Sequence, residues 1–488
     1  MLSRRELLKA AALASANLAI APALASARET SAPGSNAQES SAPLTHRPAP
    51  EAREFSSTVI ERVVERVQKA VPDKTLATMF ANCFPNTLDT TVQYSEKDGK
   101  PDTFVITGDI NAMWLRDSSA QVWSYLPFAK QDQALRRLLE GVIRRQAKCI
   151  LLDSYANAFM PSPTAAPLEW SLKDKTDLKP GVGERKWEID SLCYPIRLSH
   201  GYWKQTGDRA PFDSTWLAAM KRIVATFREQ QRKSGPGPYS FQRQAFGVND
   251  TLNLDGYGNP GRPSGLIFSM FRPSDDSCIF PFLIPSNMFA MASLGQLSEM
   301  AKAVMGDKAF AAECSGLASE VWGALDRFAT VTHEKYGQIW AFEIDGFGGQ
   351  NLMDDANVPS LLSLPWLGWC ARDDKTYLRT RSFVLSEDNP YFFRGKAAEG
   401  VGGPHIGLNQ IWPLGIIMRA LTSTDDAETA QCLRWLRDTT AGTNFMHESF
   451  DKDNPRQFTR SWFAWANSMF GELMLNIVDE RPEVLKRL

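Results

Sequence analysis

The sequence predicts an all-α fold in which about twelve helices form a toroid and irregular loops form a pocket at one end. Segments with the 3.6-residue period of amphipathic helices recur along the chain, whereas alternating segments of strand type are few. About 435 residues follow the N-terminal region, and with roughly 35 residues per helix and loop about twelve helices fit. A superhelical solenoid would fit the same count, but no repeat of fixed period supports it.

The individual helices are predicted from apolar residues that share a helical period, in residues 135–143, 216–227, 297–304, 425–436 and 470–477. Asp213 stands before the second of these segments as an N-cap, and Gly306 ends the third. The two candidate strands are residues 103–107 and 339–344. Helices therefore account for most of the expected structure.

The N-terminal region has the form of a targeting segment. Arg4 and Arg5 precede an apolar run, and the small residues Ala25-Ser26-Ala27 follow it as a cleavage site. Paired arginines of this kind are typical of a bacterial twin-arginine signal, so we expect the twin-arginine export machinery as a partner and a periplasmic or secreted location after cleavage near Ala27. The alternative is an ordinary N-terminal helix. Residues 1–27 are thus a predicted signal peptide.

A linker and one large domain are expected to follow. Residues 28–52 are rich in Ser, Ala, Pro and Glu, which predicts a disordered linker, and residues 53–488 form the predicted folded domain. The first cysteine is Cys83, so a lipid anchor at the cleavage site is excluded, and no later stretch is apolar enough to span a bilayer. We therefore expect no membrane anchor.

Charge and cysteine content exclude several classes of protein. The first 27 residues hold three basic residues and one acidic residue, which leaves 51 basic and 55 acidic residues in the remainder. That balance does not indicate a nucleic-acid partner. The seven cysteines include no CxxC pair and the five histidines no HExxH motif, so neither a disulfide framework nor a zinc site is indicated.

The stretch from Gly265 to Asn287 is the centre of the sequence pattern. Its adjacent carboxylates Asp275 and Asp276 lie among aromatic and aliphatic residues, and its prolines disfavour a regular helix. Repulsion between two acids and their desolvation raise the pKa of at least one of them, which can then act as a general acid. The structural alternative is that Asp275 caps a helix or pairs with Arg272.

Acidic and aromatic residues also coincide in other loops. They include the stretches 107–118, 186–195, 343–349, 352–359, 402–405 and 444–450. A pocket for a polyhydroxylated ring needs hydrogen-bonding groups around its rim and flat aromatic faces for the apolar side of the ring. Several such loops together indicate a carbohydrate site, although any one of them could be a capped helix start.

Five of these motifs resemble glycoside hydrolase family 125, exo-acting α-1,6-mannosidases of bacteria and fungi. They are Met113-Trp114-Leu115-Arg116-Asp117-Ser118, Trp187-Glu188-Ile189-Asp190-Ser191-Leu192-Cys193-Tyr194-Pro195, Phe271-Arg272-Pro273-Ser274-Asp275-Asp276, Asp354-Asp355-Ala356-Asn357-Val358-Pro359-Ser360-Leu361-Leu362 and His447-Glu448-Ser449-Phe450. The resemblance implies an (α/α)6 barrel, no metal or other cofactor, inversion at the anomeric carbon, and release of terminal mannose from α-1,6 linkages in oligosaccharides or glycans.

The resemblance also implies roles for individual residues. It places the general acid on the Asp-Asp pair, with Asp275 the better match and Asp276 the alternative, and the general base on Glu448. The predicted contacts to the terminal mannose are Arg116, Asp117, Asp190, Arg272, Asp276, Asp354, Asn357 and His405. Each of these could instead cap a helix or brace a loop, and His447 could orient the base or only pack.

Two other functions are compatible with the sequence. The acid pairs at 275–276, 354–355 and 373–374 could supply oxygen ligands to calcium in a metal-dependent α-mannosidase on a helical toroid. A periplasmic carbohydrate-binding protein without turnover would need the same rim of polar and aromatic residues.

Overall fold

A computed structural model describes residues 45–244 and 247–488 of the chain. The chain divides into two units, Met1–Ala42 and Pro43–Leu488, and the description below concerns the second. The predicted signal peptide, residues 1–27, lies outside the described residues, as does most of the predicted linker.

The described part of the predicted linker, residues 45–52, is structured. Arg47 is 9% exposed in its side chain; its Nε donates to Asp89 Oδ2 at 2.7 Å and its Nη1 to Glu61 Oε2 at 2.9 Å. A 3-10 helix, η1 (Pro50–Ala52), follows. The prediction of disorder to residue 52 is wrong for this part, because composition does not reveal an ion pair with elements further along the chain.

Helices dominate the described residues, as predicted. The α-helices are α2 (Thr58–Ala70), α3 (Lys74–Cys83), α4 (Asn86–Thr90), α5 (Leu115–Trp123), α6 (Gln133–Leu152), α7 (Ile189–Thr206), α8 (Ser214–Glu229), α9 (Ile284–Ala303), α10 (Lys308–Phe328), α11 (Lys375–Val384), α12 (Pro413–Thr422), α13 (Asp426–Asp438) and α14 (Ala464–Glu480). Further 3-10 helices are η2 (Leu126–Phe128), η3 (Glu169–Ser171), η4 (Val248–Asp250), η5 (Leu254–Gly256) and η6 (Pro482–Arg487). None of the helices in the described ranges is both long and apolar enough to cross a membrane.

The strands are short and form small antiparallel sheets. They are β1 (Val92–Lys97), β2 (Lys100–Val105), β3 (Met113–Trp114), β4 (Ala158–Phe159), β5 (Val182–Glu184), β6 (Phe282–Leu283), β7 (Thr330–His333), β8 (Gly337–Trp340), β9 (Glu343–Ile344), β10 (Gln350–Asn351), β11 (Phe392–Arg394), β12 (Glu399–Val401), β13 (Gln410–Ile411), β14 (Ser449–Asp451) and β15 (Phe458–Thr459). The sheets are β1-β2, β3-β4-β5, β6-β9-β10, β7-β8, β11-β12 and β13-β14-β15. Both predicted strands are confirmed, as β2 and as β8 with β9.

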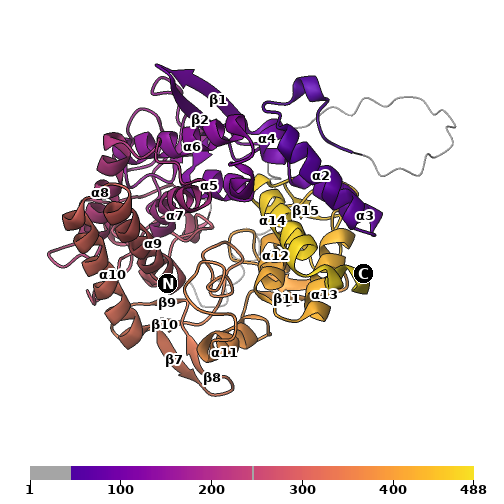
Figure 1. Cartoon of the computed structure of the whole chain (residues 1–488). Coiled ribbons are helices and arrows are strands. Elements are labelled where there is room, and N and C mark those ends of the chain that lie inside the picture. Colours follow the sequence, from indigo (N-terminus) through magenta and orange to yellow (C-terminus); the bar gives the residue numbers. More distant parts are fainter. Residues whose placement is uncertain (1–44, 245–246) are drawn as a thin grey trace, which may run out of the picture. The chain divides into compact units, whose positions relative to one another are not determined.

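Within this unit the helices follow one another round a ring (Figure 1). The inner helices contact their neighbours in the order α12, α14, α5, α7 and α9, and each packs on an outer helix next to it in sequence or, for α14, on α2 and α3. The contact between α14 and the first helices brings the two ends of the unit together. The arrangement is consistent with an α/α toroid.

One sector of the ring, between α9 and α12, has no inner α-helix in the described chain. Turns over residues 361–367 occupy it, and α11 lies beyond them. The buried carboxylate of Asp354 accepts the backbone N–H groups of Leu361 and Leu362 at 2.8 and 2.9 Å. Asp354 therefore holds these turns together, because it satisfies two buried donors that lack a helical partner.

Inner and outer helices begin differently. The outer helices α6, α8, α10, α11 and α13 each start at an aspartate whose carboxylate accepts a backbone N–H of the first turn. The inner helices α5, α7, α9, α12 and α14 have no such cap and are entered from short strands or extended residues. Their N-terminal N–H groups and positive dipole ends therefore remain available to other anionic groups.

The prolines of the central stretch do not all disfavour a helix, because Pro285 lies in the first turn of one. Residues 265–281 lack a regular helix, as expected, but α9 begins at Ile284 with Pro285 in its first turn. Proline is well accommodated there, because the N–H that it lacks has no partner in the first turn of a helix.

A buried arginine, Arg197, lies about two helical turns after the N-terminus of α7. The Arg197 guanidinium carbon is 3.7 Å from the ring centroids of both Trp123 and Trp366. Trp366 Nε1 donates to Glu472 at 3.0 Å, and burial raises the pKa of Glu472 and lowers that of Arg197 to about 10. The four side chains tie α5, α7 and α14 to the turn segment.

We expect Arg197→Met to lower the free energy of unfolding by about 3 kcal/mol, because the change leaves the half-buried Glu472 without its nearby cation. Urea unfolding followed by tryptophan fluorescence measures the loss. Arg228→Met on α8, whose side chain is 36% exposed, is the matched control and should cost at most about 1 kcal/mol. Equal stability of Arg197→Met and the wild type would contradict the prediction.

Candidate active site

The N-terminal ends of inner helices open into a cavity of about 560 Å³. Its walls include residues from the starts of α5 and α14, the loop before α9 and the loop that precedes β14. Trp114, Trp412, Phe463 and Trp465 supply aromatic faces. The structure therefore brings together the acid-rich and aromatic loops that are separate in the sequence.

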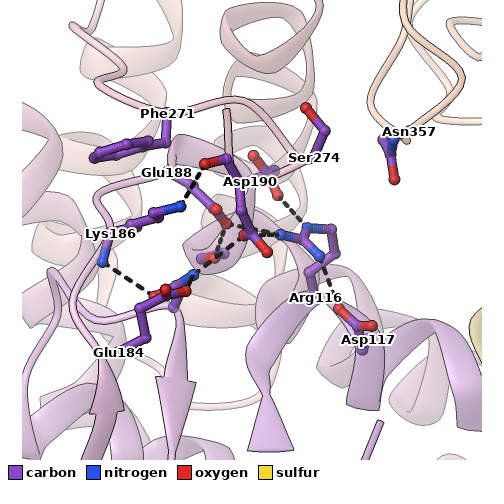
Figure 2. Close-up of polar contacts among 12 residues, drawn as sticks. Arg116, Asp117, Glu184, Lys186, Glu188, Asp190, Phe271, Ser274 and Asn357 are labelled. Atoms are coloured by element: carbon purple, nitrogen blue, oxygen red, sulfur yellow. Dashed lines mark hydrogen bonds and ion pairs between the residues drawn. The ribbon is translucent and has the colours of Figure 1, made fainter. Parts of the chain in front are cut away.

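A single buried guanidinium organises one wall of this cavity (Figure 2). Arg116 donates to Asp117 at 2.8 Å, to Asp190 at 3.1 Å, and from one nitrogen, Nη2, to both Glu188 and Asp275 at 3.0 Å. Four carboxyl groups thus surround one cation. We call these five residues the Arg116 cluster.

Asp275 is the member of the cluster that reaches the cavity most openly, with a side chain 26% exposed. Its Oδ1 also accepts Asn157 Nδ2 at 3.2 Å, and its backbone carbonyl accepts Lys186 Nζ at 2.7 Å. The backbone at Asp275 has φ 66°. This left-handed conformation is uncommon for a residue other than glycine, and the surrounding hydrogen bonds hold it in place.

The pKa values of Asp275 and of the neighbouring Glu188 are shifted in opposite directions. Burial acts to raise the pKa of Asp275, but the Arg116 guanidinium, the hydrogen bond from Glu188 and the charge of Lys186 outweigh it and hold that pKa below its usual range. Burial, together with Asp275 and Asp190, raises the pKa of Glu188 well above its usual range. These opposite pKa directions favour the protonated form of Glu188 beside the ionised form of Asp275.

Asp276 points to a different partner. Its Oδ1 accepts Asn249 Nδ2 at 2.7 Å and lies 3.1 Å from His405 Nδ1. Partial desolvation acts to lower the pKa of His405, whose side chain is 35% exposed, but Asp276 and the nearby Asp275 and Glu448 outweigh it and raise that pKa to about 9. The cavity thus contains a cationic imidazole at neutral pH, and Asp276 anchors it.

Glu448 lies on a wall of the cavity formed by other elements. Its residue is 9% exposed, and its Oε1 is 3.4 Å from Arg460 Nη1. Arg460 also pairs with Asp109 and donates to the Thr107 carbonyl at 3.4 Å. Asp275 and Glu448 therefore line the same cavity and have different cationic neighbours.

His447 packs and does not contact the Glu448 carboxylate by any hydrogen bond of the described residues. Its Nδ1 is 3.1 Å from the Arg460 carbonyl and its Nε2 3.0 Å from the Thr440 carbonyl, while its ring stacks on Phe458. The imidazole joins the two segments that carry Glu448 and Arg460, so it fixes their backbone positions.

The cavity lining includes most residues predicted from the motifs: Arg116, Asp117, Asp275, Asp276, Asn357, His405 and Glu448. Asp117 is not the N-cap of α5, since that position is Trp114 and Asp117 lies in the first turn of the helix. Burial raises the pKa of Asp117. The placement of these side chains is compatible with sugar binding, and the binding roles remain predictions.

Three predicted sugar ligands do not line the cavity. Asp190 is fully buried and accepts Arg116 Nε, Arg272 donates to Glu343 at 2.7 Å, and Asp354 holds the turns at 361–367. Burial raises the pKa of Asp190 to about 6 and that of Asp354 to about 8. The structure places these three side chains behind the cavity wall and so does not support their predicted contact with the sugar, although Asp190 Oδ1 and Arg272 Nη2 have no hydrogen-bond partner among the described residues.

Several residues that line the cavity or lie directly behind its wall had no predicted role. Glu184, Lys186 and Glu188 alternate with other residues along the segment that leaves β5, and this alternation could have indicated a shared face. Asn157 and Arg460 carry no comparable signal. They were missed because neither belongs to a motif that pairs acids with aromatics.

Comparisons with known proteins agree with this geometry. The model of a family described as metal-independent alpha-mannosidase (GH125) matches residues 73–475. The chain belongs to family GH125. This enzyme is thus a glycoside hydrolase and an α-mannosidase, which decides against a carbohydrate-binding protein without turnover.

Two relatives show how far the similarity of this GH125 enzyme extends. The meiotically up-regulated gene 157 protein of Schizosaccharomyces pombe is 42% identical over 458 residues, 90% of each chain. A solved metal-independent α-mannosidase of Streptococcus pneumoniae, in a non-productive complex with α-1,6-mannobiose, is 41% identical and has a TM-score of 0.84. That match covers 88% of this chain and 100% of the other.

The carboxylates proposed as calcium ligands have other partners. Asp275 is paired with Arg116, Asp276 with Asn249 and His405, and Asp354 with two backbone N–H groups. In the described ranges no three His, Cys, Asp or Glu side chains form a group that could hold a metal ion. The arrangement of these residues thus does not favour the calcium-dependent alternative, which the family description also opposes.

We expect α-mannosidase activity to survive dialysis against EDTA unchanged, because the cavity carboxylates are already bonded to cationic and N–H donors. Release of mannose from an α-mannoside measures the activity, with a calcium-dependent glycosidase treated in parallel as the control. Loss of activity that added calcium restores would contradict this expectation.

Proposed function

We propose that this GH125 enzyme is an exo-acting, inverting hydrolase that releases terminal mannose from α-1,6 linkages in glycans. The observation that carries the proposal is that Asp275 and Glu448, far apart in sequence, line one cavity together with His405 and Asn357. The S. pneumoniae relative, solved with α-1,6-mannobiose, supports the linkage.

The catalytic domain of the proposal is an (α/α)6 barrel. Five inner helices and the turns at residues 361–367 would make the six inner positions, with the outer ring formed by α6, α8, α10, α11, α13 and the α2–α3 pair. In such a barrel the inner elements deliver their N-terminal loops to one end. This explains how distant motifs contribute to one cavity.

Asp275 and Glu448 take the two roles that inversion needs. Asp275 would protonate the departing glycosidic oxygen, while Glu448 would remove a proton from a water that attacks the opposite face of the sugar. Inverting enzymes hold these carboxyl groups about 6.5–9.5 Å apart to admit the water. Arg460 Nη1 lies 3.4 Å from Glu448 Oε1 and is the cationic neighbour of that carboxylate.

The lowered pKa of Asp275 means that a general acid at this position needs a source for its proton, and Glu188 lies beside it. Glu188 is fully buried, Arg116 Nη2 donates to it and to Asp275 at 3.0 Å, and its Oε1 has no hydrogen-bond partner among the described residues. We propose that the pair holds one proton, which passes from Glu188 to Asp275 and on to the leaving oxygen. The apparent pKa then belongs to the pair and not to either residue alone.

The cellular location of the enzyme is a separate proposal. The twin-arginine motif, the apolar run and the Ala25-Ser26-Ala27 site support export and a periplasmic or secreted location. Under this proposal the substrate would be a glycan outside the cytoplasm.

On α-1,2-, α-1,3- and α-1,6-mannobiose we expect cleavage of the 1,6 isomer and β-mannose as the first-formed anomer, which proton NMR detects. Asp275→Asn and Glu448→Gln should lower kcat by roughly 10²–10⁴-fold with little change in KM, since each removes a proton-transfer group. First-formed α-mannose would contradict inversion, and preference for another isomer would contradict the linkage.

The matched control for these variants is Glu480→Gln, an exposed residue at the end of α14. It makes the same chemical change away from the cavity and should leave kcat and KM unchanged.

We expect Glu188→Gln to move the alkaline limb of the kcat/KM profile to lower pH by at least about one unit. The raised pKa of Glu188 keeps the shared proton until the pH rises through that value. Glutamine cannot supply this proton, and Asp275 alone, with its lowered pKa, loses its proton at lower pH.

Ser191→Ala is the control for this profile. It removes a 2.8 Å hydrogen bond to Glu188 Oε2 but keeps the carboxyl group, so its alkaline limb should stay near that of the wild type. An unchanged limb in Glu188→Gln would show that Glu188 is not the source of the proton.

A further inference from the structure

A second hollow adjoins the cavity and extends away from it. This side groove has a volume of about 630 Å³ and is lined by the Glu169–Asp174 segment with Arg243 and Gln244. Trp170 and Arg243 line both the cavity and the side groove. The two hollows therefore share part of their lining.

Trp170 has a fixed edge and a free face. Its indole Nε1 donates to Glu184 Oε1 at 3.0 Å, while the residue is 46% exposed. Arg243 pairs with Asp174 at 2.6 Å and donates to the same Glu184 oxygen at 2.8 Å. The exposed ring is thus held in place by a largely buried ion network, and an indole so held binds a ligand with little loss of side-chain entropy.

The wall that carries Trp170 is the wall of the general acid. Glu184 Oε2 accepts Asn157 Nδ2, and the same Asn157 group donates to Asp275. In Figure 2, Glu184 and Lys186 lie on one side of Arg116. Asp117 and Asn357 lie on its other side. In an inverting reaction the leaving group departs on the side of the acid, away from the water and its base.

We propose that Trp170 and the side groove bind a hexose unit of the leaving group beyond the one next to the cleaved bond. The flat indole face suits the apolar face of a pyranose ring, and the exposed Lys173 and Gln244 side chains suit hydroxyl groups. The proposal rests on the function proposed above. It makes the enzyme selective for chains of at least three sugars.

The test compares kcat/KM for α-1,6-mannotriose and α-1,6-mannobiose in the wild type, Trp170→Ala and Trp322→Ala. Trp322 on α10 is a matched control, since it is 53% exposed and does not line the cavity. We expect the wild type to prefer the triose and Trp170→Ala to lose roughly tenfold on the triose and less than twofold on the biose, because only the longer substrate reaches the ring. Trp322→Ala should keep the wild-type ratio.

The ratio of the two kcat/KM values does not depend on the fraction of folded enzyme. Trp170→Phe keeps a flat ring and most of the volume, and its ratio should lie between those of the wild type and Trp170→Ala. An unchanged ratio in Trp170→Ala, or an equal change in Trp322→Ala, overturns the proposal. Failure of the wild type to cleave either substrate would count against the proposed function instead.

Discussion

The buried guanidinium of Arg116 is the interaction on which the site depends. It joins the first turn of α5, the entrance of α7 and the loop before α9, because its partners Asp117, Glu188, Asp190 and Asp275 come from these three elements. Four carboxyl groups around one guanidinium cannot all be ionised at low cost in a buried site, so part of their negative charge is neutralised by protons. The cluster that joins these three elements therefore also includes a carboxyl group with a raised pKa, Glu188.

The uncapped inner helices fit this electrostatic arrangement. Aspartates are the N-caps of the outer helices, whereas Asp117 and Asp190 lie in the first turns of the uncapped helices α5 and α7. The positive ends of these helices favour carboxylates near the cavity. Acidic residues thus serve the fold at the outer ring and the chemistry at the inner ring.

The cavity wall around Asp275 differs from the wall around Glu448 in its neighbours. Asp275 has the buried carboxyl group of Glu188 beside it, whose pKa is raised, and Glu448 has the Arg460 guanidinium. In the proposed mechanism these different neighbours suit the different roles of a proton donor and of a group that activates water.

The sequence by itself determined the helical class, several helix boundaries and the motifs that meet at the cavity. Helical period and capping are local properties, so α6, α8 and α13 could be predicted from residues near each other in the chain. The loops of Asp275, Glu448 and His405 could be singled out because unusual residue types lie together in them, and the family resemblance gave these residues their predicted roles. Tertiary contacts were needed to find Glu188 beside Asp275, to place Asp190, Arg272 and Asp354 behind the cavity, and to show that Trp170 lines a groove. Burial, charge and hydrogen bonding decide those points, and they depend on partners more than seventy residues away, such as Arg116 with Glu188 and Asp190, which no local pattern contains.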